Sequence, residues 1–74
     1  MIAENDAWRL VCAREGGERY LSKTEVAKQA GISPRKVETM IGRYRLMKRA
    51  GVEIDRQDWW TARLTPMPPA KEAA

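Results

Sequence analysis

Histidine is absent from the 74-residue chain, and cysteine occurs only once, as Cys12. A single cysteine excludes an internal disulfide. A structural zinc site takes about four Cys or His ligands, which this composition does not supply. The missing histidine also removes the commonest general base, and with it any Ser-His or Cys-His catalytic pair. We therefore expect that the protein is not an enzyme and that it binds no metal or other cofactor.

Long apolar runs are absent as well. No segment approaches the roughly 20 apolar residues needed to cross a bilayer, and the N-terminus does not resemble a secretory signal peptide. With 43% hydrophobic and 32% charged residues, the composition is typical of a soluble globular protein. A chain of this length forms one domain at most. We expect a cytoplasmic protein with no membrane partner.

Positive charge is the one marked excess. The formal net charge is +4 and the sequence pI is about 9.6. The segment from Ser33 to Arg49 contains six basic residues and one acidic residue, Glu38, so its net charge exceeds that of the whole chain. The six basic residues are Arg35, Lys36, Arg43, Arg45, Lys48 and Arg49. Such a local concentration of cations indicates a polyanionic partner, because a single acid cannot pair with all of them.

Hydrophobic periodicity predicts a first helix over residues 3–15, ended by Gly16-Gly17. Trp8 and Cys12 lie on its apolar side, and we interpret the lone cysteine as a small buried hydrophobic residue. The sequence Ser22-Lys23-Thr24-Glu25 has the S-x-x-E form of a capping box. It predicts a second helix that runs to about Ala30.

A third helix is predicted over residues 34–50, because Ser33 is a good N-cap, proline suits the first turn and Gly51 can end the helix. At about 100° per residue, one face is apolar and predicted to lie in the core; it carries Val37, Met40, Ile41, Tyr44 and Met47. The opposite face carries Arg35, Thr39, Gly42, Leu46 and Arg49. Glycine inside a helix costs roughly 1 kcal/mol, so Gly42 suggests either close packing or the close approach of a partner.

The last segment predicts a short helix through about Leu64, with its cap within residues 55–58. Trp59 and Trp60 are adjacent and cannot share one side of a helix, so we expect one in the core and one partly exposed at an interface. The alternative is that the tryptophans stack on single-stranded bases. Residues 1–64 form the predicted domain, and the proline-rich residues 65–74 are expected to be a disordered tail or linker.

Together these segments predict an all-α fold, a small three- to four-helix bundle that contains a helix-turn-helix. The second and third helices are separated by a short turn that includes Gly31, and two helices joined by such a turn form the helix-turn-helix unit. Glycine is suited to this turn because it adopts left-handed backbone angles at little cost. A protruding helix about 10 Å wide fits the major groove of duplex DNA.

The stretch from Thr24 to Arg45 resembles the DNA-binding helix-turn-helix of bacterial and phage regulators, and its matching positions are Ala27, Gly31, Ile32, Val37 and Met40. More narrowly, the run SKTEVAKQAGISPRKVETMIGRYRLMKRAG followed by DWWTAR is similar to the helix-turn-helix of ParB-type proteins of phages and plasmids. In that group the motif follows an N-terminal ParB/sulfiredoxin-like domain, for which this chain has no room. We expect either a stand-alone small protein or an excised C-terminal part, and we carry over no nuclease or nucleotide activity.

The resemblance implies that the helix over residues 34–50 docks in the major groove and that DNA is contacted by Ser33, Arg35, Lys36, Glu38, Thr39, Arg43, Arg45, Lys48 and Arg49. Arg35 is the candidate for a bidentate contact with guanine, or else for a phosphate clamp, and Thr39 for a base edge or a thymine methyl group. Ser33 and Lys36 suit phosphates, and the later basic residues follow the backbone. Glu38 departs from this pattern: it must accept from a cytosine amine, pair with a nearby arginine, or repel phosphates.

Two classes of function follow from this reasoning. The first is a DNA-binding module for transcriptional control, partition or phage recombination, associated with the nucleoid. It acts on double-stranded DNA as a homodimer or joined to a covalently linked partner domain, since one motif offers limited contact area. The alternative is a protein-interaction adaptor that has kept the fold without DNA binding, with the exposed tryptophan and Leu46 as its contact patch.

Overall fold

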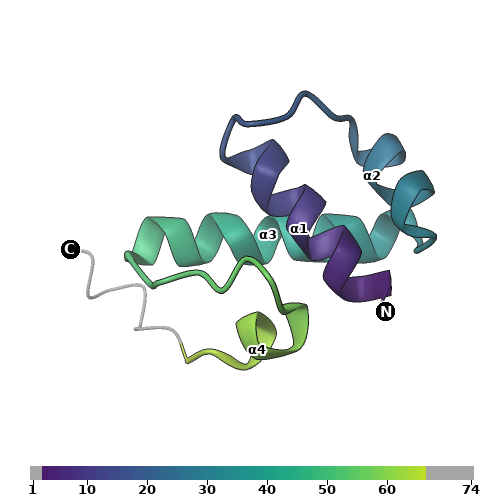
Figure 1. Ribbon diagram of the computed structural model, residues 1–74. Helices are drawn as coiled ribbons and strands as arrows, with labels where there is room; N and C mark the ends of the chain where they lie inside the picture. Colours follow the sequence, from purple (N-terminus) through teal and green to yellow (C-terminus); the bar gives the residue numbers. More distant parts are fainter. Residues whose placement is uncertain (1–2, 67–74) are drawn as a thin grey trace.

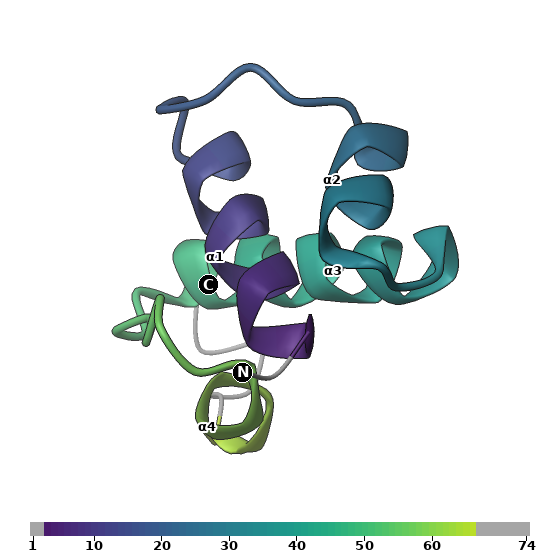
Figure 2. The same cartoon turned by 45° about the vertical axis from the view of Figure 1, so that its right-hand side comes forward.

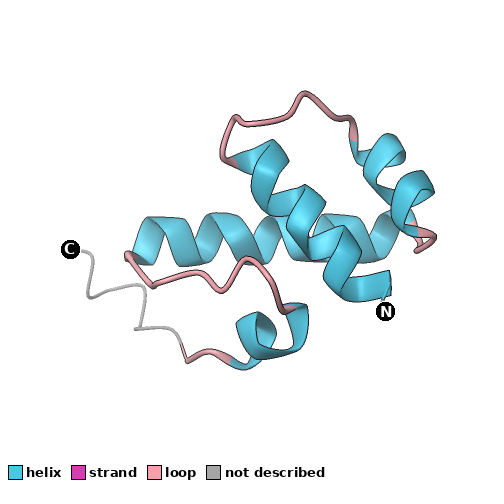
Figure 3. Ribbon diagram, viewed as in Figure 1, coloured by secondary structure: helices cyan, strands magenta, loops and turns pink. Residues whose placement is uncertain are grey.

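The computed structural model describes residues 3–66 of the chain, and within this range all regular structure is helical (Figures 1 and 3). The four helices found there are α1 (Ala3–Glu15), α2 (Lys23–Ala30), α3 (Pro34–Ala50) and α4 (Trp59–Leu64). The predicted all-α class is confirmed. The tail or linker predicted from residue 65 lies almost entirely outside the described residues. No helix within residues 3–66 combines the length and the apolar character needed to cross a membrane.

Helix α3 is the longest of these helices, and both α1 and α2 pack against it (Figures 1 and 2). Helix α1 crosses one side of α3 and contacts all three other helices. Helix α2 packs against α1 and α3, and the turn that follows it leads directly into the N-terminal end of α3. Helix α4 packs against α1 on the far side from α2. This arrangement leaves one side of α3 without a covering helix.

All four helices contribute buried side chains to the core, including Val26 and Ala27 of α2. Trp8 is fully buried, and its ring centroid lies 4.9 Å from that of Trp59 and 6.3 Å from that of Tyr44. The indole Nε1 of Trp8 donates a hydrogen bond to the carbonyl oxygen of Asp55 at 2.6 Å, which satisfies the one polar group of this buried ring. The prediction for the apolar face of α3 is confirmed, because all five of its residues are buried: Val37, Met40, Ile41, Tyr44 and Met47.

The ends of α2 and α3 are set by local capping interactions. The Oγ of Ser22 accepts from the backbone N–H of Glu25 at 3.0 Å, as one half of the predicted capping box requires. Gly31 adopts left-handed angles (φ 72°), and its N–H donates to Ala27 at the end of α2. A Cβ at residue 31 would meet no atom within 4 Å. The backbone angle alone therefore favours glycine here, and it lets the chain turn sharply into α3.

Helix α4 is short and is held by side chains from elsewhere in the chain. The carboxylate of Asp58 accepts from the N–H of Trp60 at 3.0 Å and caps the helix, as predicted from residues 55–58. The N–H of Trp59 donates to the side chain of Asn5 in α1 at 3.0 Å. Trp59 is 4% exposed and Trp60 is 57% exposed. The prediction that the adjacent tryptophans divide between core and surface is confirmed.

Candidate nucleic-acid interface

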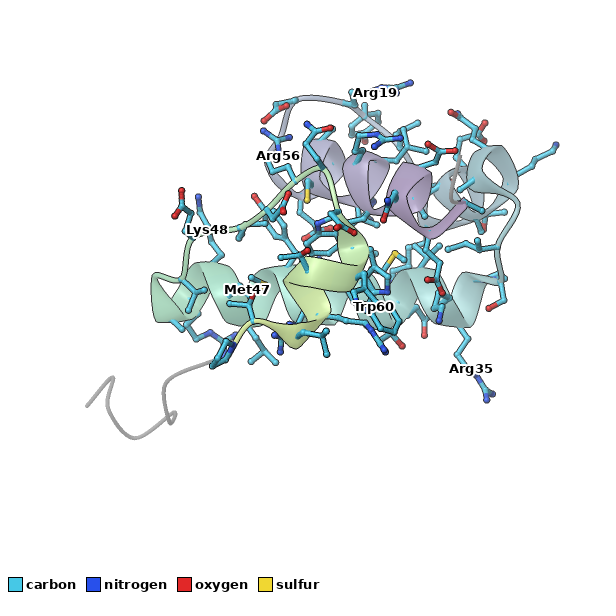
Figure 4. All side chains as sticks on the ribbon, turned by 60° about the horizontal axis from the view of Figure 1, so that its bottom comes forward. Arg19, Arg35, Met47, Lys48, Arg56 and Trp60 are labelled. Carbon is cyan, nitrogen blue, oxygen red and sulfur yellow. The ribbon has the colours of Figure 1, made fainter. Side chains whose placement is uncertain are left out.

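The uncovered side of α3 carries an exposed row of side chains, which we call the outer strip. It consists of Arg35, Thr39, Gly42, Leu46 and Arg49, all of them exposed. These residues recur every three or four positions, so they share one side of the helix, opposite the buried residues. Figure 4 shows the side chain of Arg35 extending away from the body of the protein. The face predicted from the helical period is therefore the face that the fold exposes.

The two arginines of the outer strip are not neutralised by the fold. Neither Arg35 nor Arg49 makes an ion pair within residues 3–66, although six such pairs occur there. Between them, the hydroxyl of Thr39 donates to the carbonyl oxygen of Arg35 at 3.2 Å. Its oxygen can still accept a hydrogen bond, and the residue is exposed. The strip thus offers two cations with a small amphipathic side chain one turn after the first.

The N-terminal end of α3 holds two more of the predicted contact residues. The Oγ of Ser33 accepts from the N–H of Lys36 at 3.2 Å and caps the helix, and its own O–H can still donate outwards. The Nζ of Lys36 lies 2.9 Å from the carboxylate of Glu4 in α1. Because both side chains are about two-fifths exposed (41% and 37%), this pair is weak, and an anion can replace the carboxylate at little cost.

Glu38 lies at the edge of the outer strip and pairs across the turn. Its carboxylate is 4.0 Å from the Nζ of Lys23 in α2, and its side chain is 63% exposed. Of the three roles considered for this acid, the structure shows ion pairing, with a lysine as the partner in place of the expected arginine. At this distance and exposure the pair adds little to stability. The carboxylate is therefore free to turn towards a ligand on the strip.

Two of the basic residues of α3 make contacts within the fold, Arg43 partly buried and Arg45 still exposed. The guanidinium of Arg43 donates to the carbonyl oxygen of Ala62 at 3.3 and 3.1 Å, and also to that of Thr65. It thereby caps the C-terminal end of α4, where helix carbonyls lack partners. The Nε of Arg45 donates to the carboxylate of Glu15 in α1 at 2.8 Å. Sequence reasoning placed both arginines along the DNA backbone and did not anticipate these contacts.

Lys48, the last of the predicted contact residues, is exposed but is separated from the strip. Figure 4 shows its side chain on the opposite side of α3 from Arg35. The structure therefore divides the nine residues into three groups. Arg35, Thr39 and Arg49 share the outer strip with Glu38 at its edge, Ser33 and Lys36 lie at its N-terminal end, and Arg43, Arg45 and Lys48 are directed elsewhere.

A second exposed group was missed by the sequence reasoning. The Cζ of Arg63 lies 4.1 Å from the centroid of the Trp60 ring, in a cation–π contact on the outer face of α4. Figure 4 shows Trp60 on the side of α4 that faces Arg35. The signal was present, since residues three apart on a helix are neighbours.

The cysteine offers no chemistry at this surface. Cys12 is fully buried on α1, which confirms its interpretation as a small hydrophobic residue. Burial raises the pKa of its thiol to about 11, and the nearby Arg56 guanidinium opposes this shift only in part. The thiol therefore stays protonated near neutral pH and is a poor nucleophile.

Comparisons of the chain with protein-family models, with curated proteins and with solved structures find no match. The resemblance to the helix-turn-helix of ParB-type proteins stays a prediction.

Proposed function

We propose that the protein is a DNA-binding helix-turn-helix module that docks α3 in the major groove of duplex DNA. The observation that carries this proposal is the outer strip, a row of exposed residues on a helix whose opposite face is fully used by the core. An α-helix is about 10–12 Å wide with its side chains, and the major groove is about 12 Å wide. A helix with one side uncovered by the rest of the fold can enter that groove.

The length of the strip suggests how the helix lies in the groove. Arg35 and Arg49 are separated by about 21 Å along the axis at a rise of about 1.5 Å per residue. The groove is about 12 Å wide, so a helix that crosses it from wall to wall cannot hold both cations at base edges at once. We assign Arg35 and Thr39 to base edges, because they lie in the half of α3 beside the turn. We assign Arg49 to the phosphate backbone at the other wall.

The individual contacts follow from the chemistry of each side chain. The planar guanidinium of Arg35 matches the O6 and N7 acceptors of guanine, and the methyl group of Thr39 matches that of thymine. The hydroxyl of Ser33, the ammonium of Lys36 and the backbone N–H of Arg35 suit a phosphate; Pro34 has no N–H, and the N–H of Lys36 is already bonded to Ser33. The carboxylate of Glu38 can accept from the amine of cytosine when it leaves Lys23.

One strip of this size offers limited specificity, so we propose that the module acts as a homodimer or joined to a further domain. A two-fold dimer places its helices about 34 Å apart, on two half-sites one helical turn of DNA apart. Transcriptional control, partition and phage recombination all use duplex recognition of this kind, and the resemblance to bacterial and phage helix-turn-helix proteins favours this group of processes. Such a role would place the protein in the cytoplasm, at the nucleoid.

The test is a selection of bound duplexes from a random pool, followed by titration of the selected site with Arg35→Ala. Loss of a bidentate base contact costs about 1–3 kcal/mol, and the preference at one base pair should relax. Arg19→Ala is the matched control, because Arg19 is an exposed arginine on the opposite side of the molecule from Arg35 (Figure 4). If no duplex is bound at low salt, or if both variants lose affinity equally, α3 does not dock as proposed.

A protein-interaction adaptor is the second candidate. It is favoured by large apolar side chains that the fold exposes, among them Leu46 at 49%, Trp60 at 57% and Leu64 at 60%. Partner binding through these residues would persist in high salt, because apolar burial is not screened by ions. Duplex binding through the outer strip would weaken steeply with salt. A binding assay across a salt series therefore separates the two functions.

A further inference from the structure

The geometry points to a second nucleic-acid contact on α4, in which Arg63, stacked on Trp60, binds the phosphate backbone beside the groove that α3 enters. This inference rests on the proposed function and extends it to a second element. In this inference the exposed cation–π pair supplies the phosphate contact, and the hydrogen bonds from Arg43 keep α4 beside α3.

The Trp60–Arg63 pair holds a guanidinium at the protein surface, where an anion can bind it. Stacking at 4.1 Å leaves the edge of the guanidinium, with its N–H groups, available to an acceptor. Arg63 is exposed and makes no ion pair within residues 3–66. A guanidinium held by an aromatic ring loses less side-chain entropy when it binds a phosphate than a freely rotating one.

The position of α4 relative to the outer strip is fixed by several contacts. Arg43 lies one turn from both Thr39 and Leu46 on α3 and donates to the last carbonyls of α4. Trp59 is buried against Trp8. The C-terminal end of α4 is therefore held beside the strip, and Trp60 lies on the side of α4 that faces Arg35 (Figure 4). A duplex seated on the strip has its backbone next to this end of α4.

Charge favours a polyanion over a second copy of the chain as the occupant of this face. Arg63 is the only charged residue between Trp59 and Pro66. The carboxylate of Asp58 just before it is engaged with the N–H of Trp60 and the hydroxyl of Thr61. A two-fold dimer built on this face would bring the same arginine from both copies to one interface, without an acid to pair with them.

The inference is tested by fluorescence anisotropy with a labelled duplex of random sequence, titrated at several salt concentrations. Loss of one phosphate contact in Arg63→Ala should raise Kd roughly three- to fivefold. It should also lower the slope of log K against log salt by about 0.9. Trp60→Leu keeps an apolar side chain but removes the π face, and a smaller loss in the same direction is expected. Arg19→Ala, which removes the same charge far from both surfaces, should leave the slope unchanged.

The outcomes separate this inference from the proposal beneath it. If Arg63→Ala behaves like Arg19→Ala while Arg35→Ala loses binding, α4 is not a contact and α3 still docks. If the unaltered protein binds no duplex, both ideas fail. If Trp60→Leu leaves the salt slope intact but turns a dimer into a monomer in sedimentation, the face of α4 is a self-association surface and the inference is overturned.

Discussion

Gly42→Ala should change the stability of the protein and its affinity for DNA in opposite directions, which makes it the most informative single substitution. Gly42 lies in the interior of α3, and a Cβ built there would meet no atom within 4 Å. Alanine therefore gains helix propensity without a clash, which is worth about 1 kcal/mol. In a domain of this size, 1 kcal/mol raises Tm by about 4–8 °C. The substitution should stabilise the free protein.

The same substitution should weaken the complex with DNA. Gly42 lies on the outer strip between Thr39 and Leu46, and the structure gives no packing reason for its missing side chain. What is left is the approach of a partner, since a bare backbone lets another chain or a phosphate come closest at this point. We expect Kd for duplex DNA to rise at least roughly threefold in Gly42→Ala, or by about 0.7 kcal/mol. Stability and affinity would then change in opposite directions.

The measurements are thermal unfolding followed by circular dichroism, and anisotropy titration of the same samples. Gly31→Ala is the control, because that position is equally open but has a left-handed backbone (φ 72°). It should lose about 1–2 kcal/mol of stability from the backbone alone. A fall in Tm for Gly42→Ala would refute the account of the helix. A rise in Tm with unchanged affinity would show that the partner does not approach the strip at this residue.

Three further predictions test other features of the fold. Because burial raises the pKa of Cys12 from 9.0 to about 11, the native thiol should react slowly with a disulfide reagent at pH 8, whereas the urea-unfolded chain should react rapidly. The stability that comes from burying the neutral thiol should be lost as the pH rises from about 9 to about 11, which urea titrations at each pH would measure. Arg43→Ala should speed amide exchange in α4 while leaving α2 unchanged, since it removes the cap on Ala62; equal exchange would show that α4 needs no cap. Glu38→Gln should strengthen binding to random duplexes by removing a carboxylate from the edge of the strip, and a loss confined to sites with one particular cytosine would instead identify Glu38 as a base reader.

The helix ends could be predicted because their causes are local in sequence. Ser22 and Ser33 each accept from an amide three residues later, and Gly31 and Gly51 each end a helix through left-handed angles. Such interactions depend on neighbouring residues whatever the rest of the chain does. The helical period likewise identified the buried face of α3, because every side chain on that face meets the same neighbouring helices.

The contacts that decide which charges stay exposed could not be predicted. Arg43 bonds to a carbonyl 19 residues away, and Arg45 pairs with a carboxylate 30 residues away. Counting charges treats the six cations of residues 33–49 alike, and the helical period separates them only by face, because neither carries information on tertiary partners. The exposure of Lys48 could not be predicted either, for a different reason. At the end of α3 the helical period places it near the buried side, but it is exposed there.

This division of charges changes what the basic segment means. The sequence predicted DNA contact by all six cations, but within the fold Arg43 bonds to α4, Arg45 pairs with α1 and Lys36 pairs weakly with α1. Long-range attraction of a polyanion depends on the net charge, and ion pairing within the protein does not change the net charge. At 0.1 M salt this attraction acts over a Debye length of about 10 Å. Specific contact needs cations that are exposed on one surface, and these are Arg35 and Arg49 on the outer strip, with Arg63 beside it. Substitution of Arg43 should therefore act on stability first, whereas substitutions of Arg35, Arg49 and Arg63, which make no ion pair within residues 3–66, should act on binding alone.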